Sequence, residues 1–183
     1  MKAHGIRDET TYTGEQLRSL WIYRTFGTEG DAIVWFAGPC EVSGEHLVDQ
    51  VDAAANDFIR AARMMHFIVE HFDGDLNHAI LRQRLLVCLA AEALRDGIEG
   101  LRRVGDDLFV REEKLSVSIA TVSPVSGLIH LGVNIDPAGA PVPACGLGRL
   151  GVDPWAFAER LAGAYVAEVE RMEKARCTVR SVP

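Results

Sequence analysis

Two neighbouring segments in the second half of the chain constrain its fold most strongly. Residues 114–122 (KLSVSIATV) and 127–135 (GLIHLGVNI) alternate between aliphatic side chains and small or polar ones. This two-residue period is typical of a β-strand with one buried face. The SPVSG segment between them is short enough for a hairpin turn. The pair therefore predicts a β-hairpin, which needs a larger sheet to be stable.

One face of this hairpin is expected to be polar. The aliphatic side chains should pack against helices, because burial of apolar surface is the main driving force of folding. A turn near residues 124–125 places Lys114 close to Asn134 and Ser118 close to His130. The side chains expected to look away from the helices are Lys114, Ser116, Ser118, His130, Gly132 and Asn134. A ligand-binding face and a plain solvated face both fit this pattern, but a mid-strand glycine favours close approach of another group.

The remaining segments predict a mixed α+β protein. Asp75 and Asp153 are expected to cap two helices, and Pro154 fits the first position of the second. The expected elements are a helix at 14–25, a strand at 32–37, a tight loop at 38–42, a helix at 47–62, a strand at 64–72, a helix at 76–96, an interrupted strand at 101–110, the hairpin, a loop at 136–152, and a helix from 154 to 176. We expect one domain over residues 1–183, with a largely antiparallel sheet and helices packed mainly on one face.

Composition excludes several classes of function. The net charge of −7 disfavours a protein that binds the phosphate backbone of nucleic acids. No apolar run is long enough to span a membrane, and the first residues lack the apolar core of a signal peptide. We therefore expect a cytoplasmic protein. The four cysteines are far apart in sequence, and no C-x-x-C pair indicates a metal or redox motif.

Five segments resemble an uncharacterised family known as domain of unknown function 366. They are GPCEV, MMHFIVEHFD, GDDLFV, EKLSVSIATVSPVS and LIHLGVNI. They are spread over most of the chain, so the resemblance covers nearly all of it. It implies no established activity.

A more distant resemblance is to the biotin protein ligases. Those enzymes carry Trp-Pro-Asn-Asp-Leu, then a strand with a lysine, then a strand that ends in Gly-Ile-Asn. The order GDDLFV–REEKLSVSI–LIHLGVN is similar, and it matches Asp107, Lys114 and Asn134 to the motif residues. The resemblance implies the α+β fold shared by biotin ligases, lipoate ligases and class II aminoacyl-tRNA synthetases. It also implies that Lys114 contacts an acyl carboxylate or an adenylate phosphate.

One part of the ligase pattern is missing from this sequence. Biotin ligases place a Gly-Arg-Gly-Arg loop over the adenylate, whereas the matching segment here is GPCEV, with an acid and no arginine. This departure argues against ATP-dependent activation, and no cofactor can be assigned. Within GPCEV, the residues Gly38, Cys40 and Glu41 are expected to line the mouth of a pocket or to form a plain turn.

The octanoyl transferases of lipoate synthesis offer a second comparison. They share the fold, use no ATP, and pair the lysine with a cysteine in a Pro-Cys-Gly segment. The segment PVPACGL (141–147) is similar and suggests Cys145 as a nucleophile. A thiol beside a cationic lysine would have a lowered pKa and be more reactive. A surface cysteine without a function is the alternative.

Strand 64–72 carries further candidates. His66 and Glu70 share one face of this strand, and His71 lies on the other. The first two could form a polar pocket wall, join His130 in a metal site, or be structural. We include His66 and Glu70 among the substrate-binding candidates and assign no metal.

Three functional hypotheses follow from these residues. The first is an acyl-transfer or acyl-activating enzyme with Lys114 at its centre. The second is a non-catalytic module that binds a small acyl or nucleotide-like molecule on the same fold. The third is an assembly protein that forms a homodimer through an exposed sheet edge.

Overall fold

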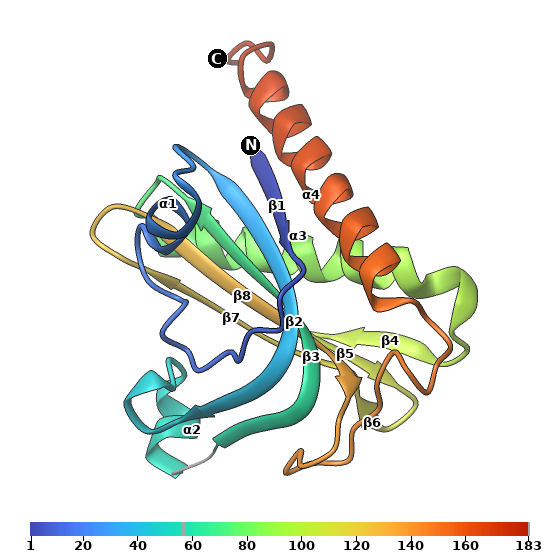
Figure 1. Cartoon of the computed structure of the whole chain (residues 1–183). Coiled ribbons are helices and arrows are strands. Elements are labelled where there is room, and N and C mark those ends of the chain that lie inside the picture. Colours follow the sequence, from blue (N-terminus) through green and yellow to red (C-terminus); the bar gives the residue numbers. More distant parts are fainter. Residues whose placement is uncertain (56–57, 183) are drawn as a thin grey trace.

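The structure is a computed structural model that describes residues 1–55 and 58–182 (Figure 1). Its helices and strands are β1 (Lys2–Ile6), α1 (Trp21–Phe26), β2 (Ala32–Ser43), η1 (Gly44–His46), α2 (Gln50–Ala55), β3 (Phe58–His71), α3 (Leu76–Leu94), η2 (Arg95–Gly97), β4 (Leu101–Val104), β5 (Asp107–Val110), β6 (Glu113–Lys114), β7 (Ser116–Val122), β8 (Gly127–Asp136) and α4 (Pro154–Arg176). Within the described ranges, no helix is long and apolar enough to cross a membrane.

A five-stranded sheet forms the centre of the fold. Its strand order is β1-β2-β3-β8-β7, and β1 pairs in parallel with β2 whereas the other neighbours are antiparallel. Helices α3 and α4 cover one face of this sheet (Figure 1). A smaller sheet, β4-β5-β6, lies beyond one end of it. This arrangement confirms the predicted mixed, largely antiparallel α+β fold with helices mainly on one face.

Strand β3 separates two apolar clusters. Met65, Phe67 and Val69 point toward α3 and α4 and belong to the larger cluster. Met64 and Ile68 point to the opposite face, into a smaller cluster with Tyr12 and Ile22 of the N-terminal segment. Because successive side chains alternate between faces, one strand can bury apolar residues on both sides of the sheet.

The two predicted helix starts are confirmed. The Asp75 carboxylate accepts a hydrogen bond from the His78 backbone N–H, and Asp153 accepts from Trp155 and Ala156, with Pro154 at the first helical turn. These side chains satisfy backbone donors that have no partner within the helix. Along α4, the side chains of Ala158, Leu161, Tyr165 and Val169 are buried. Met172 is exposed because the end of the helix extends past the sheet (Figure 1).

Three predicted elements are wrong in extent. The helix expected at 14–25 is reduced to α1, because Leu20 adopts a left-handed φ of 62° and its N–H is bound by the Glu70 carboxylate. The loop expected at 38–42 lies inside β2, with a bulge between Gly38 and Cys40. The helix expected at 47–62 is limited to α2, and β3 begins at Phe58; residues 56–57 lie outside the described part. In the last two cases pairing between strands overrides the local pattern.

The hairpin forms as predicted, but its register differs by one residue. Val122 pairs with Gly127, which places Ile119, not Ser118, opposite His130. A one-residue shift moves every side chain of a strand to the other face. Ser116 and Ser118 are therefore opposite Val133 and Leu131, on the face covered by helices.

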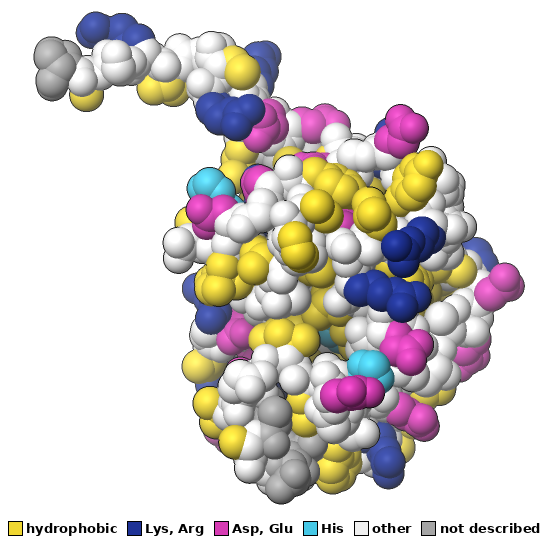
Figure 2. Space-filling view, turned by 90° about the vertical axis from the view of Figure 1, so that its left-hand side faces the viewer, with side chains coloured by type: hydrophobic (Ala, Val, Ile, Leu, Met, Phe, Trp, Pro, Cys, Tyr) yellow, Lys and Arg dark blue, Asp and Glu magenta, His cyan; other side chains and the backbone are white. Residues whose placement is uncertain are grey.

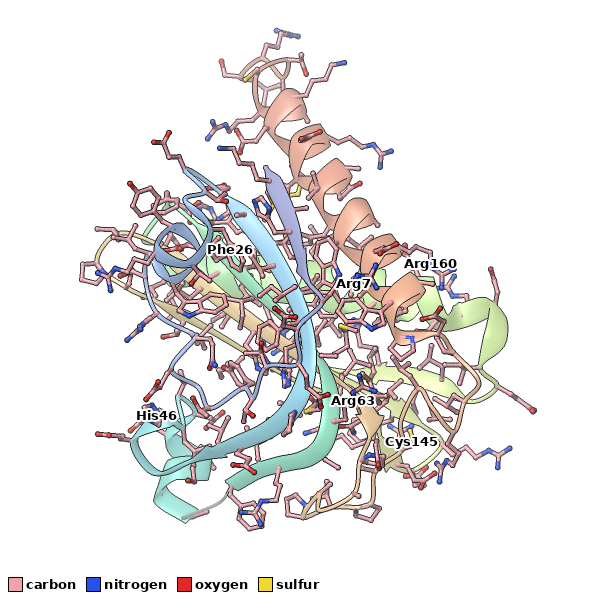
Figure 3. All side chains as sticks on the ribbon, viewed as in Figure 1. Arg7, Phe26, His46, Arg63, Cys145 and Arg160 are labelled. Atoms are coloured by element: carbon pink, nitrogen blue, oxygen red, sulfur yellow. The ribbon has the colours of Figure 1, made fainter. Side chains whose placement is uncertain are left out.

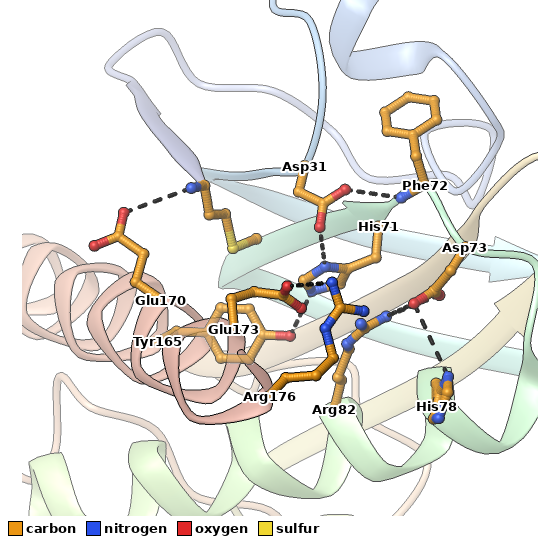
Figure 4. Close-up of polar contacts among 11 residues, drawn as sticks. Asp31, His71, Phe72, Asp73, His78, Arg82, Tyr165, Glu170, Glu173 and Arg176 are labelled. Atoms are coloured by element: carbon orange, nitrogen blue, oxygen red, sulfur yellow. Dashed lines mark hydrogen bonds and ion pairs between the residues drawn. The ribbon is translucent and has the colours of Figure 1, made fainter. Parts of the chain in front are cut away.

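A buried polar network holds α4 against the sheet (Figure 4). His71 Nδ1 lies 2.8 Å from the Asp31 carboxylate, and its Nε2 lies 2.9 Å from the Tyr165 hydroxyl. Burial alone would raise the pKa of Asp31, but hydrogen bonds from His71 and the Phe72 N–H outweigh this effect and lower the pKa. An ionised Asp31 fixes a proton on Nδ1, and in the neutral imidazole the Tyr165 hydroxyl then donates to Nε2.

We predict that Tyr165→Phe will lower the free energy of unfolding by about 1–3 kcal/mol, because it leaves buried His71 Nε2 without a donor. Chemical denaturation of the purified variant measures this loss. Tyr23→Phe is the matched control, since Tyr23 is 47% exposed and should change stability by less than about 0.5 kcal/mol. Equal stabilities of the two variants would contradict a supporting role for the network.

Candidate functional site

A cavity of about 500 Å³ lies on the sheet face that α3 and α4 leave open. Its walls come from β3, β7 and β8, from the connection between β2 and β3, and from the loop after β8. Hydrophobic side chains gather around a hollow on this side of the molecule (Figure 2). A concave, mainly apolar space with a few polar groups is typical of small-molecule sites.

The polar groups of the cavity wall are few and come from separate elements. They are His46, Asp49, Arg60, Asp106, Asp107, Lys114, Ser118, His130 and Asn134. Most other lining residues are aliphatic or aromatic, for example Leu17, Met64, Val117 and Ile119. The cavity thus combines charged groups with apolar side chains, which suits an amphipathic molecule.

Lys114 is fixed in the cavity wall beside Asp107. Its ammonium lies 2.8 Å from the Asp107 carboxylate, and about 30% of its side chain is exposed. Its backbone is held on both sides, because Lys114 N–H donates to Pro143 and its carbonyl accepts from Cys145 N–H and Asn134 Nδ2. Burial raises the pKa of Asp107, and the nearby Lys114 ammonium opposes this rise only in part.

The structure therefore brings together Asp107, Lys114 and Asn134, the three residues matched by motif order. All three border the cavity, although they come from β5, β6 and β8. An ammonium held in place by a carboxylate is suited to bind the negative charge of a ligand oxygen. Their role in binding stays a prediction.

His130 lies on the cavity wall and is hydrogen-bonded to His66 behind it. The His130 Nε2 to His66 Nδ1 distance is 3.1 Å, and both side chains are buried. Tyr12 stacks on His130 with 3.8 Å between ring centroids. Burial lowers the pKa of His66 to about 4 and also lowers the pKa of His130, which is further lowered by His66. Both imidazoles are neutral at neutral pH.

Gly38, Cys40 and Glu41 of the GPCEV segment do not line the cavity, whereas Val42 does. A Cβ on Gly38 would lie 2.0 Å from the Thr10 carbonyl oxygen, so this glycine admits the N-terminal segment and not a ligand. Cys40 is buried in the smaller apolar cluster, where burial first and Glu41 second raise its thiol pKa to about 12. Glu41 is exposed, outside the cavity lining.

Four other candidate binding residues already have hydrogen bonds or packing contacts within the protein. Ser116 Oγ accepts from the Leu108 N–H, and Ser118 Oγ, at the cavity edge, is bound to Gln83 and the Asp106 carbonyl. Glu70 binds the Leu20 N–H and the Ser126 hydroxyl. The space above Gly132 is filled by the methyl group of Met64.

The structure does not bring Cys145 to the cavity. Its side chain is buried in the helix-facing core, and burial raises its pKa, which is the opposite of an activated thiol. Its Sγ lies 3.9 Å from the Glu113 carbonyl oxygen. Figure 3 shows Cys145 in the loop after β8, far from His46 on the cavity side. This placement does not support the predicted nucleophile.

Several residues of the cavity wall could not be identified from the sequence pattern. Val117 and Ile119 were placed on the helix-covered face because of the one-residue register error. Arg60 was hidden by the helix expected at 47–62, although it lies in β3. Tyr12 lies in a segment without periodicity, and no local signal identifies it.

Sequence comparison assigns the chain to a family. The model of the family described as domain of unknown function (DUF366) matches residues 1–180. The chain belongs to this family. It is 38% identical over 176 residues to an uncharacterized protein of Methanocaldococcus jannaschii, covering 92% of this chain and 80% of that protein. A protein of unknown function from Pyrococcus horikoshi has a solved structure with 42% identity and a TM-score of 0.93, covering 99% of this chain and 100% of that one.

More distant solved structures share the fold. Biotin protein ligase from Aquifex aeolicus has a TM-score of 0.60 at 11% identity, with 95% of this chain and 72% of that chain covered. A protein from T. acidophilum, provisionally assigned as a lipoate protein ligase and carrying bound lipoic acid, has a TM-score of 0.59 at 13% identity, with coverage of 93% and 87%. These likenesses establish a biotin/lipoate ligase-like fold for the DUF366 chain.

The buried histidines predict how stability depends on pH. Below about pH 6.5 the unfolded chain binds protons on His66 and His130, whereas folded His66 stays neutral down to about pH 4. The free energy of unfolding should therefore fall as the pH falls through this window, by up to about 1.4 kcal/mol per pH unit for each histidine.

Urea denaturation between pH 7.5 and pH 4.5 measures this slope. His130→Phe should reduce the slope by one proton's contribution. An equal slope in the wild-type protein and in His130→Phe would exclude His130 as a neutral buried group.

Cysteine accessibility provides a separate test of the site. In folded protein treated with iodoacetamide, exposed Cys177 should be alkylated first, and buried Cys40 and Cys145 should react only after unfolding. Their raised pKa values leave little thiolate at neutral pH. Peptide mass spectrometry over time distinguishes the sites, and rapid labelling of Cys145 would restore it as a candidate nucleophile.

Proposed function

We propose that this protein binds a small carboxylic acid or its acyl derivative in the cavity, with Lys114 at the carboxyl end, and transfers the acyl group. The observation that carries the proposal is the Lys114 ammonium, fixed 2.8 Å from Asp107 at one end of a largely apolar cavity. An ammonium and an apolar wall recognise the two parts of an acyl compound separately.

The same geometry suits acyl transfer. A lysine held before the ligand arrives can stabilise negative charge that develops on the acyl oxygen, without reorganisation during the reaction. In the transfer step, a nucleophile of the acceptor forms a bond to the acyl carbon, and the bond to the leaving group breaks. The proton of the nucleophile passes to that leaving group. The acyl group thus moves between two partners without an added oxidant or reductant.

The charge of the cavity rim favours a pre-activated acyl donor over ATP. The connection between β2 and β3, residues 44–57, contains four Asp or Glu residues and no Lys or Arg. Side chains from this connection, including Asp49, border the cavity. Three carboxylates line the cavity, those of Asp49, Asp106 and Asp107, against two cations, Arg60 and Lys114, so the lining is acidic on balance and disfavours a nucleotide triphosphate.

The alternative is a non-catalytic module that binds the same class of molecule. Its support is the position of Cys145, which is buried away from the cavity with a raised pKa. In this alternative, Lys114 and the apolar wall hold the ligand for another protein. Ligand binding without turnover distinguishes it from the enzyme.

Binding of octanoic acid, lipoic acid and biotin tests the proposal directly. We predict that Lys114→Met will weaken binding of the best of these probes about tenfold to a hundredfold in calorimetric titration, because a charge-assisted hydrogen bond is lost. Lys114→Met leaves Asp107 without its cation, so the double variant Asp107→Asn/Lys114→Met is the charge-balanced control for misfolding.

Both variants should lose affinity while the double variant retains a cooperative unfolding transition. Unchanged affinity in Lys114→Met would refute the role of Lys114. Incubation with octanoyl thioester, followed by mass analysis of the acyl donor and an amine acceptor, then separates transfer from binding alone.

A further inference from the structure

A chain of hydrogen bonds runs from the β2 backbone to the cavity. His66 Nε2 lies 3.2 Å from the Gly38 carbonyl oxygen, and His66 Nδ1 lies 3.1 Å from His130 Nε2. His66 is completely buried, whereas His130, at 2% exposure, borders the cavity. The chain therefore connects a fixed backbone group to the cavity wall.

The carbonyl at one end determines which nitrogens carry protons. A carbonyl oxygen only accepts, so His66 Nε2 must carry a hydrogen. In a neutral imidazole the other nitrogen is then an acceptor, and His66 Nδ1 accepts from His130 Nε2–H. His130 Nδ1 is consequently left with a lone pair. Burial keeps both rings neutral by lowering their pKa values.

Packing prevents His130 from adopting another orientation. The Tyr12 ring lies nearly parallel to it, at 14° and a centroid distance of 3.8 Å, and the His66 ring stacks at 25°. The Met64 methyl group occupies the space beside it, above Gly132. Rotation of the imidazole would break these contacts together with the hydrogen bond to His66.

Within residues 1–55 and 58–182, no protein group donates to His130 Nδ1. This nitrogen is not among the fully enclosed side-chain atoms that lack a partner in the described ranges, so it is open to the cavity that His130 borders. We propose that His130 Nδ1 accepts a hydrogen bond from a hydroxyl, amine or amide N–H group at the far end of the ligand, and that His66 positions it for this role. This inference rests on the proposed function.

Strand geometry sets the length of such a ligand. Asn134 donates to the Lys114 carbonyl, and His130 is four residues further along β8. At the usual rise of a strand, the Cα atoms of Asn134 and His130 are about 13 Å apart, which gives only the scale of the ligand. The ligand is therefore an elongated acyl compound with a carboxyl or carbonyl group near Lys114 and a hydrogen-bond donor near the opposite end. Val117 and Ile119 line the apolar space on the cavity wall.

Matched pairs of fatty acids test this specificity. Octanoic, decanoic and dodecanoic acids are compared with their ω-hydroxy derivatives by calorimetric titration of the full chain. The ω-hydroxy acid of the best length should bind about fivefold to tenfold tighter than the plain acid, as expected for one net hydrogen bond. His130→Phe should abolish the preference, and His78→Phe on the exposed side of α3 should keep it.

Nitrogen-15 spectra of labelled histidines test the hydrogen-bond chain from Gly38 through His66 to His130. The main measurement uses the wild-type protein, so it does not depend on the folding of a variant. In the wild-type protein, His130 should be protonated at Nε2 and bare at Nδ1. The Nδ1 resonance should move when ω-hydroxydecanoic acid is added, and stay in place with decanoic acid. In His66→Phe, His130 should become a mixture of tautomers, which a merely structural His66 would not cause.

The outcomes separate the two proposals. Equal binding of plain and ω-hydroxy acids would overturn the role of His130 and leave the acyl-binding proposal intact. Binding of neither series would overturn both. A protonated Nδ1 on wild-type His130 would refute the proposed hydrogen-bond chain, independently of the results with the fatty acids.

Discussion

The structure depends on the burial of both faces of β3. This strand pairs with β2 and β8 along most of its length, and its side chains alternate between the helix-covered core and the open face. Phe67 packs beneath α4, whereas His66, one residue earlier, points to the cavity side. Because both sets of side chains are buried, the register cannot shift by one residue without placing His66 in the apolar core. The position of the candidate site is thus fixed by the same contacts that stabilise the sheet.

Local sequence signals predicted the elements whose stability is mainly local. The caps at Asp75 and Asp153 and the alternation of the hairpin strands are examples. Hairpin register depends on the loop, where Ser123 N–H donates to the Ser126 carbonyl, and this contact is invisible in the residue pattern. The predicted face of β8 was still right, and Lys114 still reached the cavity. Leu115 lies between β6 and β7 and belongs to neither strand, so Lys114 does not follow the alternation of side chains in the hairpin.

The cavity walls were harder to predict because long-range pairing creates them. Leu47, Val51, Ala54 and Phe58 have helical spacing, yet Phe58 pairs with Ser43 at the start of β3. The GPCEV segment contains glycine and proline, which favour a loop, yet β2 continues through it because Tyr12 donates to Pro39 and accepts from Glu41. Neither contact involves residues near in sequence. The motif order of Asp107, Lys114 and Asn134 identified one end of the cavity, and no comparable pattern marked Tyr12 or Arg60 at the rest.

The buried polar groups of the sheet differ in how many of their polar atoms have a hydrogen-bond partner within the protein. His71 has protein partners on both ring nitrogens, and Glu70 receives two hydrogen bonds, so each is accounted for by stability alone. His130 has a protein partner on one nitrogen, in the part of the chain that the structure describes. A fully satisfied network strengthens a fold, whereas a ring nitrogen without a protein partner at a cavity wall can accept a hydrogen bond from another molecule. The single-partner histidine is also the one that borders the cavity. This is the physical reason to regard the open face of the sheet as a binding surface, with Lys114 and His130 as its two polar contacts for a ligand.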